Sequence, residues 1–140
     1  MRLLSSGRES FAARGEMLRQ AEKTLDVQYF IVQGDNTGRL FLDGLMWAAD
    51  RGVRVRLLID DSTDTGRDAQ ARILDAHPNI EVRVFNPFLY RGPLEFLRYA
   101  EFAFTAPRLT YRMHNKLMVA DNTVAVIGGR NIGDEYFAAS

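Results

Sequence analysis

Residues 113–133 read Met-His-Asn-Lys-Leu-Met-Val-Ala-Asp-Asn-Thr-Val-Ala-Val-Ile-Gly-Gly-Arg-Asn-Ile-Gly, and this stretch decides how the chain is expected to fold. Two short apolar runs flank Asp121 and Asn122, a pair that is typical of a tight turn. The pattern predicts a β-hairpin with strands over 113–120 and 123–127.

Alternation along the first strand of this hairpin puts the side chains of His114, Lys116 and Met118 on one face. With a two-residue turn, Lys116 lies opposite Ile127 and His114 lies opposite Gly129. Because Gly129 has no side chain, the hairpin is expected to leave room beside the imidazole for a bound group.

His114, Lys116 and Asn131 together suit the chemistry of an anionic oxygen ester. A neutral imidazole can attack phosphorus or accept a proton near neutral pH. The Lys116 ammonium can neutralise phosphate charge, and the Asn131 amide can donate to a non-bridging oxygen, as can backbone N–H groups around Gly128 and Gly129. The alternative is a surface hairpin that carries these residues by chance, and the complete spacing favours the site.

That spacing, His-x-Lys-x4-Asp followed by Gly-Gly and Asn, resembles the signature of the phospholipase D superfamily. Four further runs are similar to the N-terminal half of bacterial cardiolipin synthases, most of all those of the synthase C type. They are LDVQYF (25–30), ADRGVRVR (49–56), PNIEVR (78–83) and GGRNIGDEYF (128–137). The superfamily motif is carried by His114, Lys116, Asp121, Gly128, Gly129 and Asn131.

The resemblance implies a two-step phosphoryl transfer that needs no metal or other cofactor. One His forms a phosphohistidine, a second His protonates the leaving oxygen, and water or an alcohol resolves the intermediate. By matching position, His114 is the nucleophile or the acid, and Lys116 and Asn131 bind the phosphate of a phosphatidylglycerol-like phospholipid. Asp121 is the motif acid, and its place at the turn favours a structural Asx-type contact away from the phosphate.

The chain departs from the family pattern in two ways. The family site has two motifs, whereas this sequence has one, so the second must come from a later half of the parent protein or from a second copy. Family members also orient the catalytic His with an acid on a later strand, and Asp134 and Glu135 are unsupported substitutes for it. We therefore expect residues 1–140 to be one half-domain, truncated at its C-terminus.

The amino-acid composition disfavours or excludes several kinds of partner and site. The 140 residues carry a formal net charge of zero, so an overall basic field for nucleic acid is absent, and a nucleic-acid partner is disfavoured. The chain has no cysteine, which excludes disulfides and cysteine-based metal sites. No apolar run reaches the length of a membrane span, so we expect a soluble piece of a parent that lies on the cytoplasmic side, peripheral to the inner membrane.

The rest of the chain predicts an α/β fold: a mixed, mostly parallel sheet flanked by helices, which the hairpin joins. Thr37 is the expected cap of the second helix, whose inward residues would be Leu40, Phe41, Leu45, Trp47 and Ala48. In the third helix the expected inward residues are Ala69, Ile73 and Leu74. Helices are expected at 8–24, 39–51 and 66–76, and strands at 25–32, 53–60 and 80–85.

Three other features have alternative interpretations. Asp60-Asp61-Ser62 could bind a metal, but capping of the following loop and helix is favoured. His77 lies in a loop signal and is expected to be structural or solvated. The irregular segment 86–112, with a short helix at 94–101, could contact a lipid, a nucleic acid base or a partner subunit, or could cover the sheet edge.

The leading function is a phospholipase D-type phosphodiesterase or phosphatidyltransferase of the cardiolipin synthase kind. The first alternative is a dimeric phosphodiesterase or nuclease of the same superfamily, which would be expected to carry a basic groove. The second is a half-domain that binds phosphate or a phospholipid headgroup without turnover.

Overall fold

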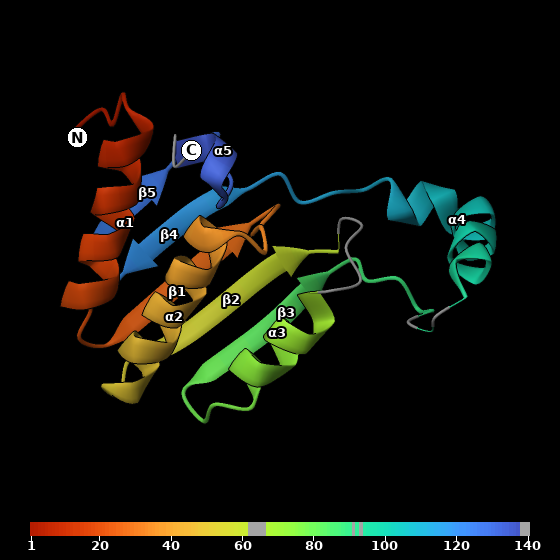
Figure 1. The fold of residues 1–140 in the computed structure, drawn as a ribbon, viewed down its shortest axis with the longest axis horizontal. Helices are drawn as coiled ribbons and strands as arrows, with labels where there is room; N and C mark the ends of the chain where they lie inside the picture. Colours follow the sequence, from red (N-terminus) through yellow and green to blue (C-terminus); the bar gives the residue numbers. More distant parts are fainter. Residues whose placement is uncertain (62–66, 91, 93, 138–140) are drawn as a thin grey trace.

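The computed structural model describes residues 1–61, 67–90, 92 and 94–137. It places four helices on one side of a five-stranded sheet, with a fifth helix standing apart (Figure 1). Among the described helices, none is long and apolar enough to cross a membrane. The elements in chain order are α1 (Gly7–Gln20), β1 (Thr24–Tyr29), α2 (Asn36–Asp50), β2 (Arg54–Asp60), α3 (Arg67–Asp75), β3 (Ile80–Phe85), α4 (Glu95–Leu109), β4 (Lys116–Ala120), β5 (Val124–Ile127) and α5 (Asp134–Phe137).

The sheet has the strand order β3-β2-β1-β4-β5. Strands β1, β2 and β3 are parallel, and the hairpin β4–β5 joins antiparallel beside β1. The predicted mixed sheet and its hairpin are therefore confirmed. The core lies between the sheet and α1 and α2, where alternate residues of β1 and β2 are buried: Leu25, Val27, Tyr29, Val55 and Leu57.

The second and third helices bury a different set of residues from the one predicted. Leu40 and Trp47 are exposed, because Phe41, Leu45 and Ala48 define the buried face of α2 and each neighbour lies 100° away around the helix. On α3, Leu74 is buried and Ile73 is exposed, whereas Ala69 lies outside the residues whose burial is described.

The cap of α2 also differs from the prediction. Asp35 is the N-cap residue, and its side chain accepts a hydrogen bond from the Gly38 N–H at 2.9 Å. Thr37 lies inside the first turn instead, where its N–H donates to Asp134. An Asp side chain is among the strongest caps, which explains why the helix begins before Thr37.

The register of the hairpin is shifted by one residue from the prediction. Asp121 and Asn122 both have positive φ, and the Thr123 N–H donates to the Ala120 carbonyl, as in a two-residue turn. The ladder nevertheless pairs Ala120 with Val124, so Thr123 is an extra residue between turn and ladder.

Residues 86–112, which we call the arm, leave the body at the carboxyl ends of β2 and β3 (Figure 1). Its helix α4 runs to Leu109 rather than ending at 101, with a kink at Thr105 just before Pro107. Asp61 accepts from the Phe88 N–H at 2.7 Å, and Asp60 accepts from the Met113 N–H at 2.8 Å. These carboxylates hold the two bases of the arm, whereas Ser62 and the residues that lead into α3 lie outside the described residues.

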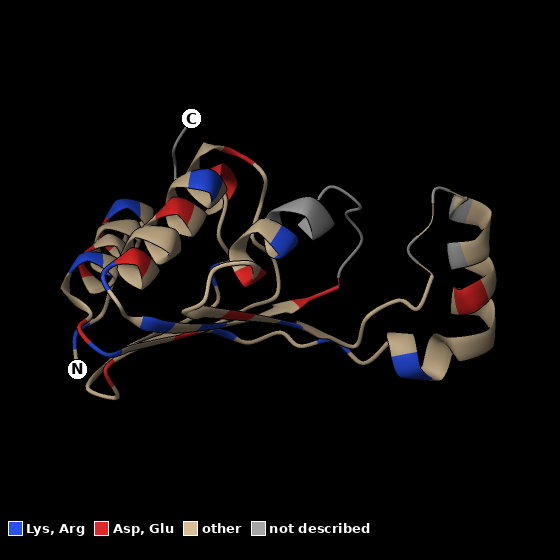
Figure 2. Cartoon of the chain, turned by 90° about the horizontal axis from the view of Figure 1, so that it is seen from below, with Lys and Arg blue, Asp and Glu red and all other residues tan. Residues whose placement is uncertain are grey.

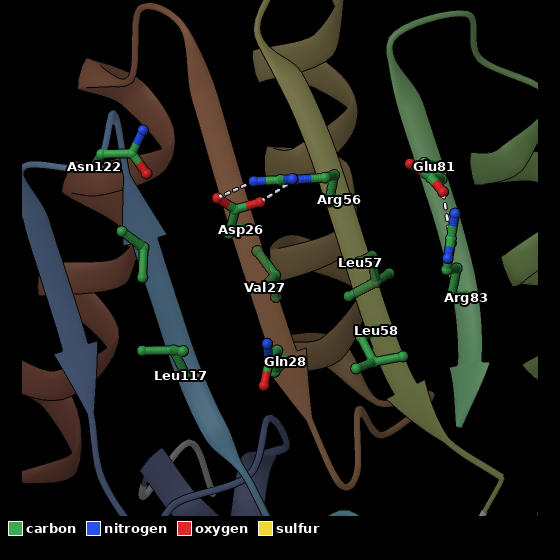
Figure 3. A pocket seen from close by; sticks show the side chains of 11 residues that line it. Asp26, Val27, Gln28, Arg56, Leu57, Leu58, Glu81, Arg83, Leu117 and Asn122 are labelled. Atoms are coloured by element: carbon green, nitrogen blue, oxygen red, sulfur yellow. Dashed lines mark hydrogen bonds and ion pairs between the residues drawn. The ribbon is translucent and has the colours of Figure 1, made fainter. Parts of the chain in front are cut away.

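The sheet face opposite α1–α3 carries both charged and apolar side chains. Figure 2 shows the helices of the body on a single side of the sheet, and Figure 3 shows the side chains on the other side. The Arg56 guanidinium donates to both carboxylate oxygens of Asp26 on the neighbouring strand, and Arg83 pairs with Glu81 along β3. The opposite charges within each of these two ion pairs neutralise each other.

Candidate active site

The candidate site lies where β1 ends. Tyr29, the last residue of β1, pairs with Lys116, the first residue of β4. The next two residues of the chain, Phe30 and Ile31, then contact three of the side chains predicted for the site. In α/β sheets the carboxyl ends of parallel strands are the usual place for a binding site, because the connecting loops meet there.

His114 precedes β4 and is held by an aromatic stack. Its imidazole lies on the Phe30 ring with centroids 4.4 Å apart and planes inclined by 17°. The residue is exposed to solvent, so an approaching ligand can reach the free face of the imidazole. The stack restricts the orientation of the ring without using either ring nitrogen, which leaves both nitrogens for chemistry.

Lys116 lies on the same aromatic platform. Its Nζ is 5.1 Å from the centroid of the Phe30 ring and donates to the His114 carbonyl at 2.7 Å. Partial burial lowers the pKa of the Lys116 ammonium, because the charged form loses solvation. A bound phosphate anion would stabilise the charged form of this ammonium, which is the behaviour expected of a lysine that binds phosphate.

Asn131 is buried and firmly held beside Ile31. Its Oδ1 accepts from the Ile31 N–H at 3.2 Å, and its Nδ2 donates to the Tyr136 hydroxyl at 3.2 Å. A parallel bridge between Val32 and Ile132 fixes the same two segments. An amide nitrogen carries two hydrogens, so one N–H of Asn131 is left for a phosphate oxygen.

The hydrogen bonding of Gly128 and the position of Gly129 in the hairpin differ from the prediction. The Gly128 N–H donates to the Lys116 carbonyl at 3.1 Å, so it is part of the hairpin ladder and is not free for a phosphate. The shifted register also means that Gly129 is not the residue opposite His114. A Cβ atom built on Gly129 would meet no atom within 4 Å, so space at this glycine is open.

Asp121 occupies the opposite end of the hairpin from His114, as predicted. Six residues lie between them, five of which form β4, a span on the order of 20 Å. The Asp121 carboxylate accepts from the N–H groups of Glu22, Lys23 and Thr24 at 2.7–2.9 Å. These bonds lower the pKa of Asp121, and they join the hairpin to the start of β1 instead of forming a local Asx turn.

The two acids considered for orienting His114 have other partners in the described structure. Asp134 accepts from the Thr37 N–H at 2.9 Å, and its interactions with Thr37 lower the pKa of Asp134. Glu135 accepts from the Gln33 amide at 3.4 Å. Asp134 therefore ties α5 to the first turn of α2, and Glu135 ties it to the segment between β1 and α2.

The other expectations concern metals and the second histidine. Within the described residues, no group of three His, Cys, Asp or Glu side chains could hold a metal ion. His77 lies between α3 and β3, where Nδ1 accepts from the Asn79 N–H and Nε2 lies 3.2 Å from Asp50. These contacts agree with the structural role predicted for it.

Phe30 is the contact residue that reasoning from the sequence missed. It contacts both His114 and Lys116, yet 84 residues separate it from His114, and no motif joins the two. The sequence does contain one signal. Phe30 comes directly after an apolar strand, and residues in that position lie at the carboxyl end of the sheet, where binding sites usually form.

Comparison with known proteins supports the same family. The family model for the phospholipase D-like domain of cardiolipin synthase matches residues 15–140. Cardiolipin synthase C of Escherichia coli (strain K12) is 51% identical over 136 residues, which are 97% of this chain and 28% of the relative. The cardiolipin synthase of Halalkalibacterium halodurans is 32% identical, and the match covers 96% of this chain and 24% of the relative.

Two solved structures share the fold. NucT from Helicobacter pylori has a TM-score of 0.67 at 16% identity, covering 94% of this chain and 72% of that one. Nuc from Salmonella typhimurium, a phospholipase D family member, has a TM-score of 0.60 at 17% identity, covering 92% and 68%. The chain spans about a quarter of the length of the two cardiolipin synthases, and it belongs to the phospholipase D-like domain family of cardiolipin synthases.

Proposed function

We propose that this chain supplies one half of a two-motif active site that transfers or hydrolyses a phospholipid phosphodiester. The observation that carries the proposal is the meeting of His114, Lys116 and Asn131 around residues 30 and 31. A nucleophile, a cation and an amide donor around one exposed position are the parts that a phosphoryl transfer needs.

The proposed reaction has two steps. A ring nitrogen of His114 attacks phosphorus, a P–N bond forms, and the P–O bond to the departing alcohol breaks. A second His, outside this motif, gives its proton to the departing oxygen and then deprotonates the incoming alcohol or water. The new P–O bond forms as the P–N bond breaks, which regenerates His114. The same geometry allows His114 to take the acid role if the partner His attacks.

The second His must come from outside the hairpin motif, because His77 lies at the other end of the sheet between α3 and β3. A C-terminal half of the parent protein or a second copy of this chain would supply it. Lys116 and Asn131 would then hold the phosphate from one side, and their counterparts would hold it from the other side.

The first test uses the fact that the chain has only two histidines. Inorganic phosphate is titrated while the imidazole resonances of His114 and His77 are followed by NMR. We expect the His114 resonance to move and the His77 resonance to stay. A shift of neither resonance, or an equal shift of both, would contradict the proposed phosphate site.

The second test measures hydrolysis of a chromogenic phosphodiester over a range of protein concentrations. If two copies complete the site, activity per chain should rise with concentration and should vanish in His114→Ala. The matched control is His77→Ala, which removes the other imidazole and should keep the activity. Wild-type turnover in His114→Ala would remove His114 from the mechanism.

A further inference from the structure

The arm exposes an unusual amount of aromatic surface. It holds seven of the 15 aromatic residues of the chain within 27 residues. Phe96 is 62% exposed, Tyr99 is 73% exposed and Phe104 is 88% exposed, and Leu89 and Tyr111 are also exposed. Monomeric proteins rarely leave this much clustered apolar surface in water unless another surface covers it.

One side of α4 is fixed to the arm itself. The Glu101 carboxylate accepts from the Leu89 N–H at 2.8 Å and from the Tyr90 N–H at 2.9 Å, and it pairs with Arg108. Phe96 and Tyr99 lie at least 140° away from Glu101 around the helix, given 100° per residue. Their exposed rings therefore point away from the side that holds the helix in place.

The exposed rings do not form a single flat face. Phe104 lies about 60° from Glu101 around the helix, on a different side from Phe96 and Tyr99. A rigid protein partner would cover one face of such a helix, whereas the interfacial layer of a bilayer surrounds an inserted helix on several sides. Tyr and Phe rings with basic residues nearby are the composition that favours this layer.

Charge and position agree with a bilayer. The arm contains four arginines and two glutamates, a formal charge of +2 (4 − 2) in a chain whose net charge is zero. It would therefore be attracted to anionic headgroups. Figure 1 shows α4 beyond the carboxyl ends of the parallel strands, and the segment that leaves α4 runs to β4, which begins two residues after His114.

We propose that the arm inserts its exposed aromatic side chains into the surface of an anionic phospholipid bilayer and so brings headgroup phosphates to His114. The inference rests on the proposed function, because it names the surface from which the site draws its substrate. Asp60 and Asp61 hold the bases of the arm, so insertion of α4 would orient the body over the membrane.

The test is sedimentation of the whole chain with two kinds of vesicle, phosphatidylcholine alone and equal parts phosphatidylcholine and phosphatidylglycerol. We expect stronger binding to the mixed vesicles. Phe96→Ser combined with Tyr99→Ser should weaken that binding about tenfold or more, because two exposed rings no longer enter the bilayer. The matched control is Leu40→Ser combined with Trp47→Ser, two exposed apolar residues on α2, which should bind like the wild type.

Three outcomes would overturn the inference: equal binding by wild type and arm variant, equal loss in both double variants, or an arm-dependent dimer in sedimentation without vesicles. The last would assign the aromatic surface to a second copy of the chain.

The phosphate-induced shift of the His114 resonance is measured in the same samples without lipid. If that shift persists in the arm variant while vesicle binding does not depend on the arm, the inference fails and the proposed function stands. If the shift is absent and arm-dependent binding is present, the arm binds the membrane, but the proposed function fails and with it the delivery of headgroup phosphates to His114.

Discussion

The two ends of the β4–β5 hairpin contain similar residues, but their side chains make different kinds of contact. Each end has one of the two lysines of the chain, Lys116 at the open end and Lys23 beside the turn. At the turn, the Asp121 carboxylate is saturated by three backbone N–H groups. At the open end, the exposed His114 ring stacks on Phe30, and the Lys116 Nζ lies over the same ring.

One sequence motif thus combines residues proposed for chemistry with an acid that holds the hairpin on the sheet. The motif residue Asp121 fastens the turn of the hairpin to the start of β1, next to the pairing of Leu25 with Ala120 that sets the register of β4 on β1. His114 and Lys116 depend on that position, because they face Phe30 only in the observed pairing of Tyr29 with Lys116. Substitutions at the open end should therefore change activity, and substitutions at the turn should change stability.

After the complete loss of activity expected for His114→Ala, the largest effect is expected for Lys116→Ala. Loss of the ammonium removes a preorganised charge from the phosphate, and the loss of one such group costs about 10²- to 10³-fold in turnover. The affinity for inorganic phosphate should fall with it, whereas the urea unfolding midpoint should change little because the side chain is only partly buried. Phosphodiester hydrolysis and phosphate titration measure the two effects.

Lys23→Ala is the matched control, because it removes the only other lysine at the far end of the hairpin. Its turnover and phosphate affinity should equal those of the wild type. If both lysine variants lose phosphate affinity equally, the loss reflects net charge and not the site, and the division between the two ends of the hairpin breaks down.

Much of the fold and of the candidate site could be predicted from the sequence, and the features that were missed have a common cause. The spacing of His114, Lys116 and Asn131 predicted the set that meets at one edge, and the apolar run at 80–85 matched β3 at both ends. The predicted register was wrong because Thr123 adds a residue between the turn and the ladder, and a local pattern also cannot reveal that Asp121 accepts hydrogen bonds from a segment nearly a hundred residues earlier. Phe30 was missed for the same reason, since its stack on His114 exists only once distant strands pair.

An intermediate effect is expected for Phe30→Leu. The substitution keeps an apolar side chain but removes the ring that stacks on His114, and aromatic pairs of this kind contribute about 0.5–1.5 kcal/mol. We expect turnover to fall about tenfold, which corresponds to the upper end of that range. The pH profile and the His114 imidazole resonance should change as well, because the ring loses its fixed environment.

Two further variants show whether the stack itself is responsible. Phe30→Tyr keeps the ring and should restore both turnover and the His114 resonance. Phe85→Leu removes another partly exposed Phe at the same edge of the sheet and should leave both readouts unchanged. A normal His114 resonance in Phe30→Leu would mean that the stack does not position the imidazole.

The smallest effect on chemistry, and a clear one on stability, is expected for Asp121→Asn. Asn tolerates the positive φ at this position, so the change isolates the carboxylate charge. Because three N–H bonds lower the pKa of Asp121 in the folded state, its stabilisation is complete above the unfolded pKa of about 3.9 and is lost as pH falls through the folded pKa. The variant should therefore unfold at a lower urea concentration than the wild type at neutral pH, and the gap should narrow in acid below about pH 4. Asp43→Asn, on the exposed surface of α2, controls for the loss of one negative charge, and a gap of the same size and pH dependence there would show that the contacts of Asp121 have no special part in fastening the hairpin.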